Sequence, residues 1–315
     1  MMIAGRSGRT VNGAAGVAVD RNQPNAIAAA LGDGVDLLLD CVCYDEEQAE
    51  QLLRVGERVG SLVVLSSLSV YADEQGRSLD EARTPEEFPD FPVPVTEEQP
   101  TVPPGPETYS TRKVAMERRL LDQDQVAVTV LRPGAIHGPH STHAREWFFV
   151  KRALDDRPVV ILAYGGTSRF HPTGVANLAE AVLASSDQGG QVVFNLVDPD
   201  CPTVAEIGHA VAALMGHQPA EILLPGPPEG TVGDSPWAVA RPFVASSEAA
   251  AERLGYAPVT TYREQLDDDV AWLLHATAVE DWRTVLPDLV HNYPVDFFNY
   301  SAEETYLRTH ADLTL

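Results

Sequence analysis

The chain has 315 residues, a formal net charge of −24 at pH 7 and an isoelectric point near 4.6. This length allows one large or two modest domains, and so acidic a surface repels the phosphate backbone of nucleic acids. Its three cysteines are too few for a disulfide framework. No apolar run approaches the ~20 residues that span a bilayer, and the N-terminus lacks the apolar core of a signal peptide. The composition therefore predicts a cytoplasmic protein that binds neither nucleic acid nor membrane.

The first part of the chain predicts short elements and then a longer strand. Residues 16–20 are typical of a short strand, and residues 23–32 of an Ala-rich helix. Residues 35–43 form a near-continuous apolar run, which indicates a parallel strand buried on both faces. Cys41 and Cys43 lie at its end, and two thiols without a histidine or a second pair make a poor zinc site. Buried packing cysteines are therefore favoured.

The next segments predict a helix, a strand and a long loop. Residues 45–59 form a helix whose acidic first turn suits the helix dipole. Residues 61–71 are typical of a buried strand that stops in hydroxyl-bearing residues. Residues 71–108 are rich in Pro, Glu and Asp, which indicates a long loop. Such loops are often functional lids, and a solvated acidic loop fits the same composition.

Tyr109 and Lys113 are four residues apart, one turn along a helical face. A Lys ammonium beside a phenol stabilises the phenolate and lowers a pKa that is ~10 when unperturbed. A Tyr tuned in this way can exchange a proton with a substrate hydroxyl near neutral pH. Ser67, at the end of the preceding strand, could hydrogen-bond the same substrate oxygen. The spacing alone also occurs by chance on exposed helices.

Residues 126–139 predict the next strand, which Pro133 and Gly134 end. His137, His140 and His143 follow close together. Three histidines suggest a metal site, but no carboxylate or cysteine lies at a convincing companion spacing. Histidines that line a pocket or lie in a loop are favoured instead.

The remaining segments predict a second set of elements. Residues 147–154 indicate an apolar helix, residues 191–197 a strand, and Thr203 with Glu206 a capping box that opens an Ala-rich helix. Residues 219–242 are rich in Pro and Gly and predict a loop. Residues 276–315 carry several aromatic side chains, which indicate a tail that packs on the body or on a partner.

Several of these segments occur together in one order: Val63-Val-Leu-Ser-Ser-Leu-Ser-Val-Tyr71, Thr96-Glu-Glu, Tyr109-Ser-Thr-Arg-Lys113 and Val130-Leu-Arg-Pro-Gly-Ala-Ile-His-Gly-Pro139. From about Val17 to about Leu274, the series resembles the extended short-chain dehydrogenase/reductases, which include NAD-dependent sugar epimerases and dehydratases. The resemblance implies an α/β fold, a Rossmann-like doubly wound parallel sheet with a smaller C-terminal substrate domain. It implies a dinucleotide-binding domain of residues 1–138 and 167–198, a substrate-binding domain of residues 139–166 and 199–275, and an extension of residues 276–315.

The resemblance also implies roles for individual residues. Ser67 positions the substrate hydroxyl, Tyr109 is the acid/base, and Lys113 lowers the pKa of Tyr109 and contacts a ribose. The expected cofactor is NAD or NADP, and its contacts fall on Arg6, Asp20, Arg21, Cys41, Val42, Lys113, Pro133 and Gly134. The expected substrate contacts fall on Ser69, His137 and Arg169. A homodimer through the helix of residues 45–59 and the Tyr109 helix is implied as well.

The beginning of the chain departs from this family, whose members open with a strand, a Gly-x-x-Gly-x-x-Gly turn and a helix that bind the pyrophosphate. The glycines at positions 5, 8, 13 and 16 neither follow a full strand nor open an apolar helix. Residues 1–4 are interpreted as the family's second strand, so that the central first strand is missing. Arg6 and Arg9 then lie where NADP-preferring members often carry a base, or in a frayed basic terminus. A start codon placed too far downstream, a fold that closes the gap differently and a cofactor-free descendant all stay open.

The sequence as a whole predicts an NAD(P)-dependent oxidoreductase, epimerase or dehydratase. Its substrate would be a small polar molecule, with nucleotide sugars as one class. One alternative is a cofactor-independent lyase or isomerase that keeps the Tyr109 proton shuttle. Another is a non-catalytic binding protein that has lost the dinucleotide loop.

Overall fold

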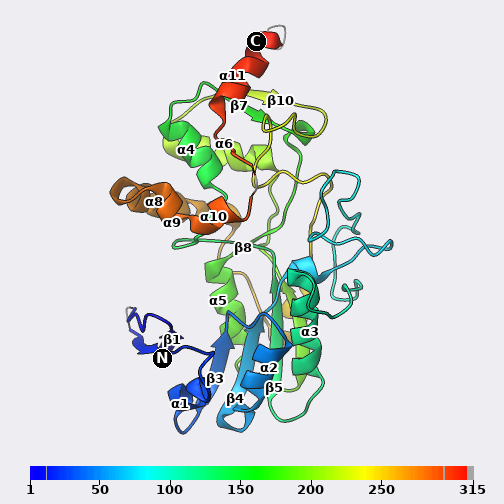
Figure 1. Ribbon diagram of the computed structural model, residues 1–315, viewed down its shortest axis with the longest axis vertical. Helices are drawn as coiled ribbons and strands as arrows, with labels where there is room; N and C mark the ends of the chain where they lie inside the picture. The colour runs from blue at the N-terminus through cyan, green and yellow to red at the C-terminus, as the bar shows by residue number, and fades with distance from the viewer. Residues whose placement is uncertain (12, 294, 311–315) are drawn as a thin grey trace. The chain divides into compact units, whose positions relative to one another are not determined.

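The computed structural model describes residues 1–11, 13–293 and 295–310, and the chain divides into two compact units (Figure 1). Unit 1 consists of Met1–Val70, Thr101–Arg132 and Val182–Phe194, and unit 2 of Tyr71–Pro100, Pro133–Ala181 and Asn195–Leu315. The predicted dinucleotide-binding domain differs from unit 1 because residues 71–100, 133–138, 167–181 and 195–198 cluster with unit 2. Which unit binds substrate stays a prediction.

The strands are β1 (Met2–Gly5), β2 (Ala15–Ala18), β3 (Val35–Asp40), β4 (Val59–Leu65), β5 (Ala127–Pro133), β6 (Ala135–His137), β7 (Val159–Leu162), β8 (Pro172–Gly174), β9 (Gln191–Leu196) and β10 (Ala220–Leu223). The α-helices are α1 (Ala26–Leu31), α2 (Glu46–Leu53), α3 (Tyr109–Leu121), α4 (Trp147–Leu154), α5 (Val175–Ala184), α6 (Val204–Met215), α7 (Glu248–Leu254), α8 (Tyr262–Val279), α9 (Trp282–Val285), α10 (Pro287–His291) and α11 (Tyr300–Thr309). Short 3-10 helices are η1 (Gly56–Arg58), η2 (Leu68–Val70) and η3 (Tyr164–Gly166). Among the described residues, no helix is both long and apolar enough to cross a membrane.

A sheet with the strand order β3-β4-β5-β9 forms the centre of unit 1 (Figure 1). β4 pairs in parallel with β3 and β5, and Leu62 lies opposite Leu38 on one side and Val128 on the other. Because side chains alternate along a strand, Leu62 and Val64 share one face. Side chains of α2 and α3 join the same buried apolar cluster and cover this face. The predicted α/β fold class is confirmed.

The other face of the sheet lies against the end of α5. Ser61 is the neighbour of Leu62 and therefore points to the opposite side. Its hydroxyl donates a hydrogen bond to the carbonyl of Ser185, just after α5, at 3.4 Å. Helical segments thus lie on both faces, as in a doubly wound sheet.

β3 is an edge strand, and this corrects the prediction that residues 35–43 are buried on both faces. Its hydrogen-bonded neighbour in the sheet is β4 alone, whereas β1 and β2 form a separate two-stranded parallel sheet with Met2 opposite Ala15. Leu39 is 40% exposed and Val42 is 50% exposed. The apolar composition of β3 suits a central strand, but no described strand occupies its second edge.

Unit 2 contains two small parallel sheets, β6 with β8 and β7 with β10, and its own apolar core. β10 corrects the prediction of a loop throughout residues 219–242. The sequence predicts that the C-terminal extension packs either on the body of the protein or on a partner. Its described residues pack within unit 2, on the body of the protein. Buried Arg152 on α4 donates to the carbonyl of Phe297 at 2.8 Å and to Glu303 on α11 at 2.6 Å.

Candidate functional site

Ser67 lies just beyond the C-terminal end of β4. The strand hydrogen bonds continue past its last residue, because the Ser66 amide donates to the Leu131 carbonyl at 2.7 Å. Ser67 then leaves the sheet, and its hydroxyl accepts a hydrogen bond from the Ser69 amide at 3.1 Å. This local bond favours a turn over further strand. It leaves the half-buried Ser67 hydroxyl at the strand end, where open α/β sheets bind ligands.

Tyr109 is the first residue of α3, and the cap of this helix fixes its first turn. The Thr108 hydroxyl accepts from the Thr111 amide at 3.2 Å, and the Thr111 hydroxyl accepts from the Thr108 amide at 2.9 Å. Such reciprocal capping satisfies two amides that a helix start leaves unpaired. Tyr109 is 38% exposed, so its ring lies partly open at the surface of unit 1.

Hydroxyl groups join the start of α3 to the segment after β4. The buried Ser110 hydroxyl donates to the Ser69 hydroxyl at 3.0 Å. Ser69, a predicted substrate contact, therefore already has a partner within unit 1. The bond brings the Ser67 segment and the Tyr109 segment next to each other, although they are about 40 residues apart in the sequence.

Lys113 lies one turn below Tyr109 and is 1% exposed. Its Nζ donates to the carbonyl oxygens of Cys43 and Leu65, each at 2.8 Å. The ammonium lies 5.7 Å from the centre of the Tyr109 ring and 4.6 Å from that of Tyr44. Burial lowers the pKa of Lys113 to about 8, whereas the carbonyl acceptors favour the charged form. One N–H remains for a ligand, since an ammonium has three donors.

The predicted cofactor contacts at the end of β3 surround a buried carboxylate. Asp40 accepts from the Val42 amide at 2.8 Å and pairs with the Arg21 guanidinium at 3.1 Å. Arg21 also donates to the Val42 carbonyl at 2.9 Å, so it ties the end of β3 to the segment after β2. Asp20 is exposed and accepts from the Asn22 amide at 3.1 Å.

The two cysteines at the end of β3 have different surroundings. Cys43 is fully buried, and burial raises the pKa of its thiol to about 12. Cys41 is exposed, which corrects the prediction of two buried packing cysteines.

The glycine-rich opening forms a turn between two strands. The Gly8 amide donates to the Gly5 carbonyl at 3.1 Å, and Gly8 has a positive φ of 59°. A Cβ on Gly16 would lie 2.3 Å from the Gly8 carbonyl oxygen. Close contact of the chain with itself therefore accounts for Gly8 and Gly16, whereas a Cβ on Gly5 or Gly13 would meet nothing within 4 Å. No helix follows β1 within the described part of residues 6–14, and Arg6 is exposed in the turn.

The remaining predicted site residues belong to unit 2. Gly134 donates its amide to the Thr173 hydroxyl at 2.8 Å, and a Cβ there would lie 2.2 Å from the His171 carbonyl oxygen. Pro133 ends β5, and Arg169 is exposed. His137 is 1% exposed, and both of its ring nitrogens bond carboxylates of unit 2.

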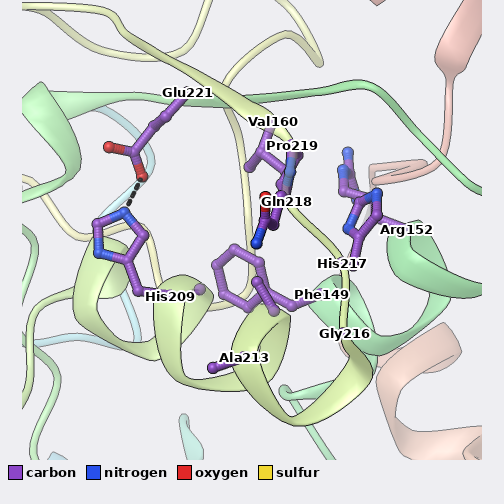
Figure 2. A pocket seen from close by; sticks show the side chains of 12 residues that line it. Phe149, Arg152, Val160, His209, Ala213, Gly216, His217, Gln218, Pro219 and Glu221 are labelled. Carbon is purple, nitrogen blue, oxygen red and sulfur yellow. Dashed lines mark ion pairs between the residues drawn. The ribbon is translucent and has the colours of Figure 1, made fainter.

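A pocket of about 330 Å³ lies in unit 2 among α4, α6, β7 and β10 (Figure 2). Phe149 contributes to its lining, and His209 on α6 pairs with Glu221 on β10 at 3.3 Å. The lining includes none of the residues that the sequence predicts for catalysis, cofactor or substrate.

The sequence matches no protein-family profile and no curated protein. Among solved structures, MoeE5 in complex with UDP-glucuronic acid and NAD is similar with a TM-score of 0.63 and 20% identity, over 87% of this chain and 91% of that chain. UDP-glucuronic acid 4-epimerase from Bacillus cereus, in complex with UDP-glucuronic acid and NAD, is similar with a TM-score of 0.53 and 16% identity. This similarity covers 73% of this chain and 67% of that chain. dTDP-glucose 4,6-dehydratase from Bacillus anthracis, in complex with NAD, is similar with a TM-score of 0.53 and 18% identity. This similarity covers 76% of this chain and 69% of that chain.

These similarities establish a shared fold. The chain has the fold of these NAD-bound proteins, which include an epimerase and a dehydratase. The fold that the sequence resemblance implies is therefore confirmed.

Proposed function

We propose that the chain is an NAD(P)-dependent oxidoreductase, epimerase or dehydratase that acts on a small polar substrate through Tyr109. The observation that carries the proposal is the geometry at the start of α3, where a partly exposed phenol lies one turn above a buried ammonium. The segment that carries Ser67 is hydrogen-bonded to the same helix start. The similar solved structures, which hold NAD and UDP-sugars, support nucleotide sugars as the substrate class.

Each residue has a distinct role in this proposal. Tyr109 takes a proton from the substrate hydroxyl or returns it, and Ser67 holds the same oxygen by a hydrogen bond. Lys113 places a positive charge near the phenol, which favours the phenolate. Its two carbonyl acceptors keep the ammonium in place, so that no reorganisation is needed when the proton moves. A bound nicotinamide would supply hydride exchange with the substrate carbon.

The described residues fit such a cofactor at one end. The free N–H of Lys113 suits a ribose hydroxyl, and the exposed Val42 and Cys41 leave the end of β3 open. The other end of the cofactor needs a turn and a helix N-terminus for the pyrophosphate. The described part of residues 1–20 forms a closed turn between β1 and β2 without a helix.

The second candidate is a cofactor-independent lyase or isomerase that keeps the Tyr109 proton transfer. A non-catalytic binding protein is the third reading. A homodimer through α2 and α3 belongs to the first proposal, and light scattering in solution tests it.

Titration of the full chain with NADH and with NADPH, followed by cofactor fluorescence, separates the candidates. The oxidoreductase proposal predicts saturable binding that the nonfluorescent oxidised cofactor reverses. The absence of binding to either would overturn it in favour of the other two. Conversion of UDP-sugars without added cofactor would then identify the lyase or isomerase, provided that Tyr109→Phe abolishes it.

A further inference from the structure

Unit 2 encloses a polar cluster that the proposed function does not use. His137 at the end of β6, Glu146 before α4, Asp198 after β9 and Asp269 on α8 are each no more than 3% exposed. One imidazole and three carboxylates thus share a buried region. Carboxylates that lie this close together are costly to bury unless a cation or protons compensate their charge.

One side of His137 is fixed by Asp198. The distance from His137 Nε2 to Asp198 Oδ2 is 2.7 Å. The other oxygen of Asp198 accepts from the Gly174 amide at 2.7 Å and from the Asn177 side chain at 2.8 Å. Asp198 is therefore a carboxylate that accepts the Nε2 proton and orients the ring.

The other side of His137 faces the remaining carboxylates. Nδ1 lies 2.9 Å from Asp269 Oδ2, and Asp269 Oδ1 has no hydrogen-bond partner among the described residues. Glu146 accepts from the Tyr262 hydroxyl at 2.9 Å. One ligand atom each from His137, Glu146 and Asp269 lie within 4.8 Å of one another.

We propose that His137, Glu146 and Asp269 bind a divalent transition-metal ion, with Asp198 as the partner that orients the imidazole. A histidine that binds a metal typically gives its other N–H to a carboxylate, which is the relation of His137 to Asp198. An imidazole together with carboxylates suits Zn²⁺ or Mn²⁺ better than Mg²⁺ or Ca²⁺.

The geometry of the cluster allows this ion with small side-chain movements. Ligand atoms at about 2.1 Å from Zn²⁺ lie about 3.4 Å apart in a tetrahedral site. Two ligand atoms at the 4.8 Å limit would therefore have to approach each other by about 1.4 Å. The unpartnered Asp269 Oδ1 offers a further oxygen. The ion would join β6, α8 and the start of α4, so its role would be structural.

Metal content and thermal unfolding of the full chain test the proposal. The chain is purified without added metal, analysed by inductively coupled plasma mass spectrometry, stripped with a chelator, and then unfolded by heat with and without Zn²⁺ or Mn²⁺. The expected results are about one ion per chain and a higher unfolding temperature on readdition. Protons should be released on binding, because the ligand atoms must be deprotonated.

Variants locate the site. Asp269→Asn and Glu146→Gln keep the shape of the side chain and should weaken metal binding by more than roughly 100-fold, since loss of an outer partner alone costs 10- to 100-fold. Asp198→Asn should weaken it by roughly 10- to 100-fold. The matched control is Asp267→Asn, which makes the same charge change at an exposed position of α8 and should leave binding unchanged.

Two results would overturn the proposal. One is a wild-type chain that holds no metal and whose unfolding temperature neither ion raises, which would mean that shared protons compensate the cluster. The other is binding that Asp267→Asn weakens as much as Asp269→Asn does. Both wild-type measurements are informative even if a variant fails to fold.

Discussion

The ammonium of Lys113 is buried near Tyr109 and is held by two carbonyl acceptors. The chain contains two lysines, Lys113 and Lys151. A guanidinium stays protonated in proteins, whereas a buried ammonium changes its pKa readily. Burial lowers the pKa of Lys113 to about 8, so the group is charged at neutral pH but close to its titration range.

An NMR titration of the chain labelled with ¹³C at the lysine Cε measures this pKa directly. Two lysines give two resonances, and the spectrum of Lys113→Met identifies the one from Lys113. We expect this resonance to titrate near pH 8. A midpoint at the ordinary lysine value of 10.5 would show that the carbonyl acceptors fully offset the effect of burial on the Lys113 pKa.

The same shift makes the free energy of unfolding depend on pH. Between about pH 8 and pH 10.5, Lys113 binds more protons in the unfolded chain than in the folded chain. The free energy of unfolding therefore rises with pH in this window. Relative to Lys113→Met, the wild type should gain on the order of 3 kcal/mol across this window. Urea unfolding at both ends of the window tests the change, with Lys151→Met as the control. A wild-type advantage that stays constant or shrinks would contradict it.

At the residue scale, sequence reasoning works where partners are local. Tyr109 and Lys113 are one helical turn apart, so their proximity follows from helix geometry. The partners of His137 are 61 and 132 residues away in the chain. No spacing rule reaches that far, so the sequence around the three histidines does not reveal these carboxylates. His140 and His143 instead contact the rings of Trp272 and Tyr293.

At the element scale, α3 is held at both its start and its middle. Its cap fixes the first turn, and Glu117 farther along pairs with Arg132 on β5. The guanidinium donates to both carboxylate oxygens, at 3.0 and 2.6 Å, and both residues are buried. Two parallel bonds of this kind fix orientation as well as distance. The pair thus holds the helix that carries Tyr109 against the sheet.

Glu117→Gln should destabilise the chain strongly. The substitution leaves the Arg132 charge buried without its counter-ion, and loss of one partner of a buried pair costs about 3–5 kcal/mol. Urea unfolding measures the loss, and Glu47→Gln on the exposed face of α2 is the matched control. A loss of only ~0–1 kcal/mol, the range of a surface ion pair, would mean that this contact does not hold α3 in place.

Elements with local signals were predicted, whereas elements that depend on distant neighbours were not. The capping box at Thr203 and the helix around Tyr109 are encoded within a few residues, and both form. The exposure of β3 depends on whether another strand pairs with its second edge. The apolar sequence of β3 itself does not predict this pairing. β10 is four residues long in a Pro/Gly-rich segment and is formed by pairing with β7, about 60 residues earlier.

At the scale of the whole molecule, the acidic charge opposes the compact state. A net charge of −24 produces repulsion among surface carboxylates, which dissolved salt screens. The sequence predicted this charge fully. It did not predict how the chain divides, because residues 71–100 join unit 2 through contacts with distant segments, such as that of Glu97 with the Asn195 amide at 2.7 Å.

Raising the salt concentration from low to physiological should raise the apparent unfolding temperature. Relief of about 1 kcal/mol of repulsion corresponds to a rise of roughly 1.5 °C for a chain of 315 residues, because the entropy of unfolding is about 2.1 cal/mol/K per residue. Differential scanning calorimetry in NaCl and KCl tests the effect, and equal shifts in the two salts exclude binding of a specific cation. An unfolding temperature that falls with salt would show that attractive ion pairs outweigh the net repulsion.

The central claim is that the Tyr109 hydroxyl transfers the proton, and the turnover of Tyr109→Phe on a converted UDP-sugar tests it most directly. Tyr44→Phe is the matched control. The ring of Tyr44, like that of Tyr109, lies beside Lys113, and the substitution likewise removes a phenol hydroxyl. We predict that Tyr109→Phe lowers kcat by roughly 100- to 10,000-fold with little change in substrate binding, whereas Tyr44→Phe leaves kcat within a few-fold of the wild type. Equal rates for Tyr109→Phe and the wild type would contradict the claim.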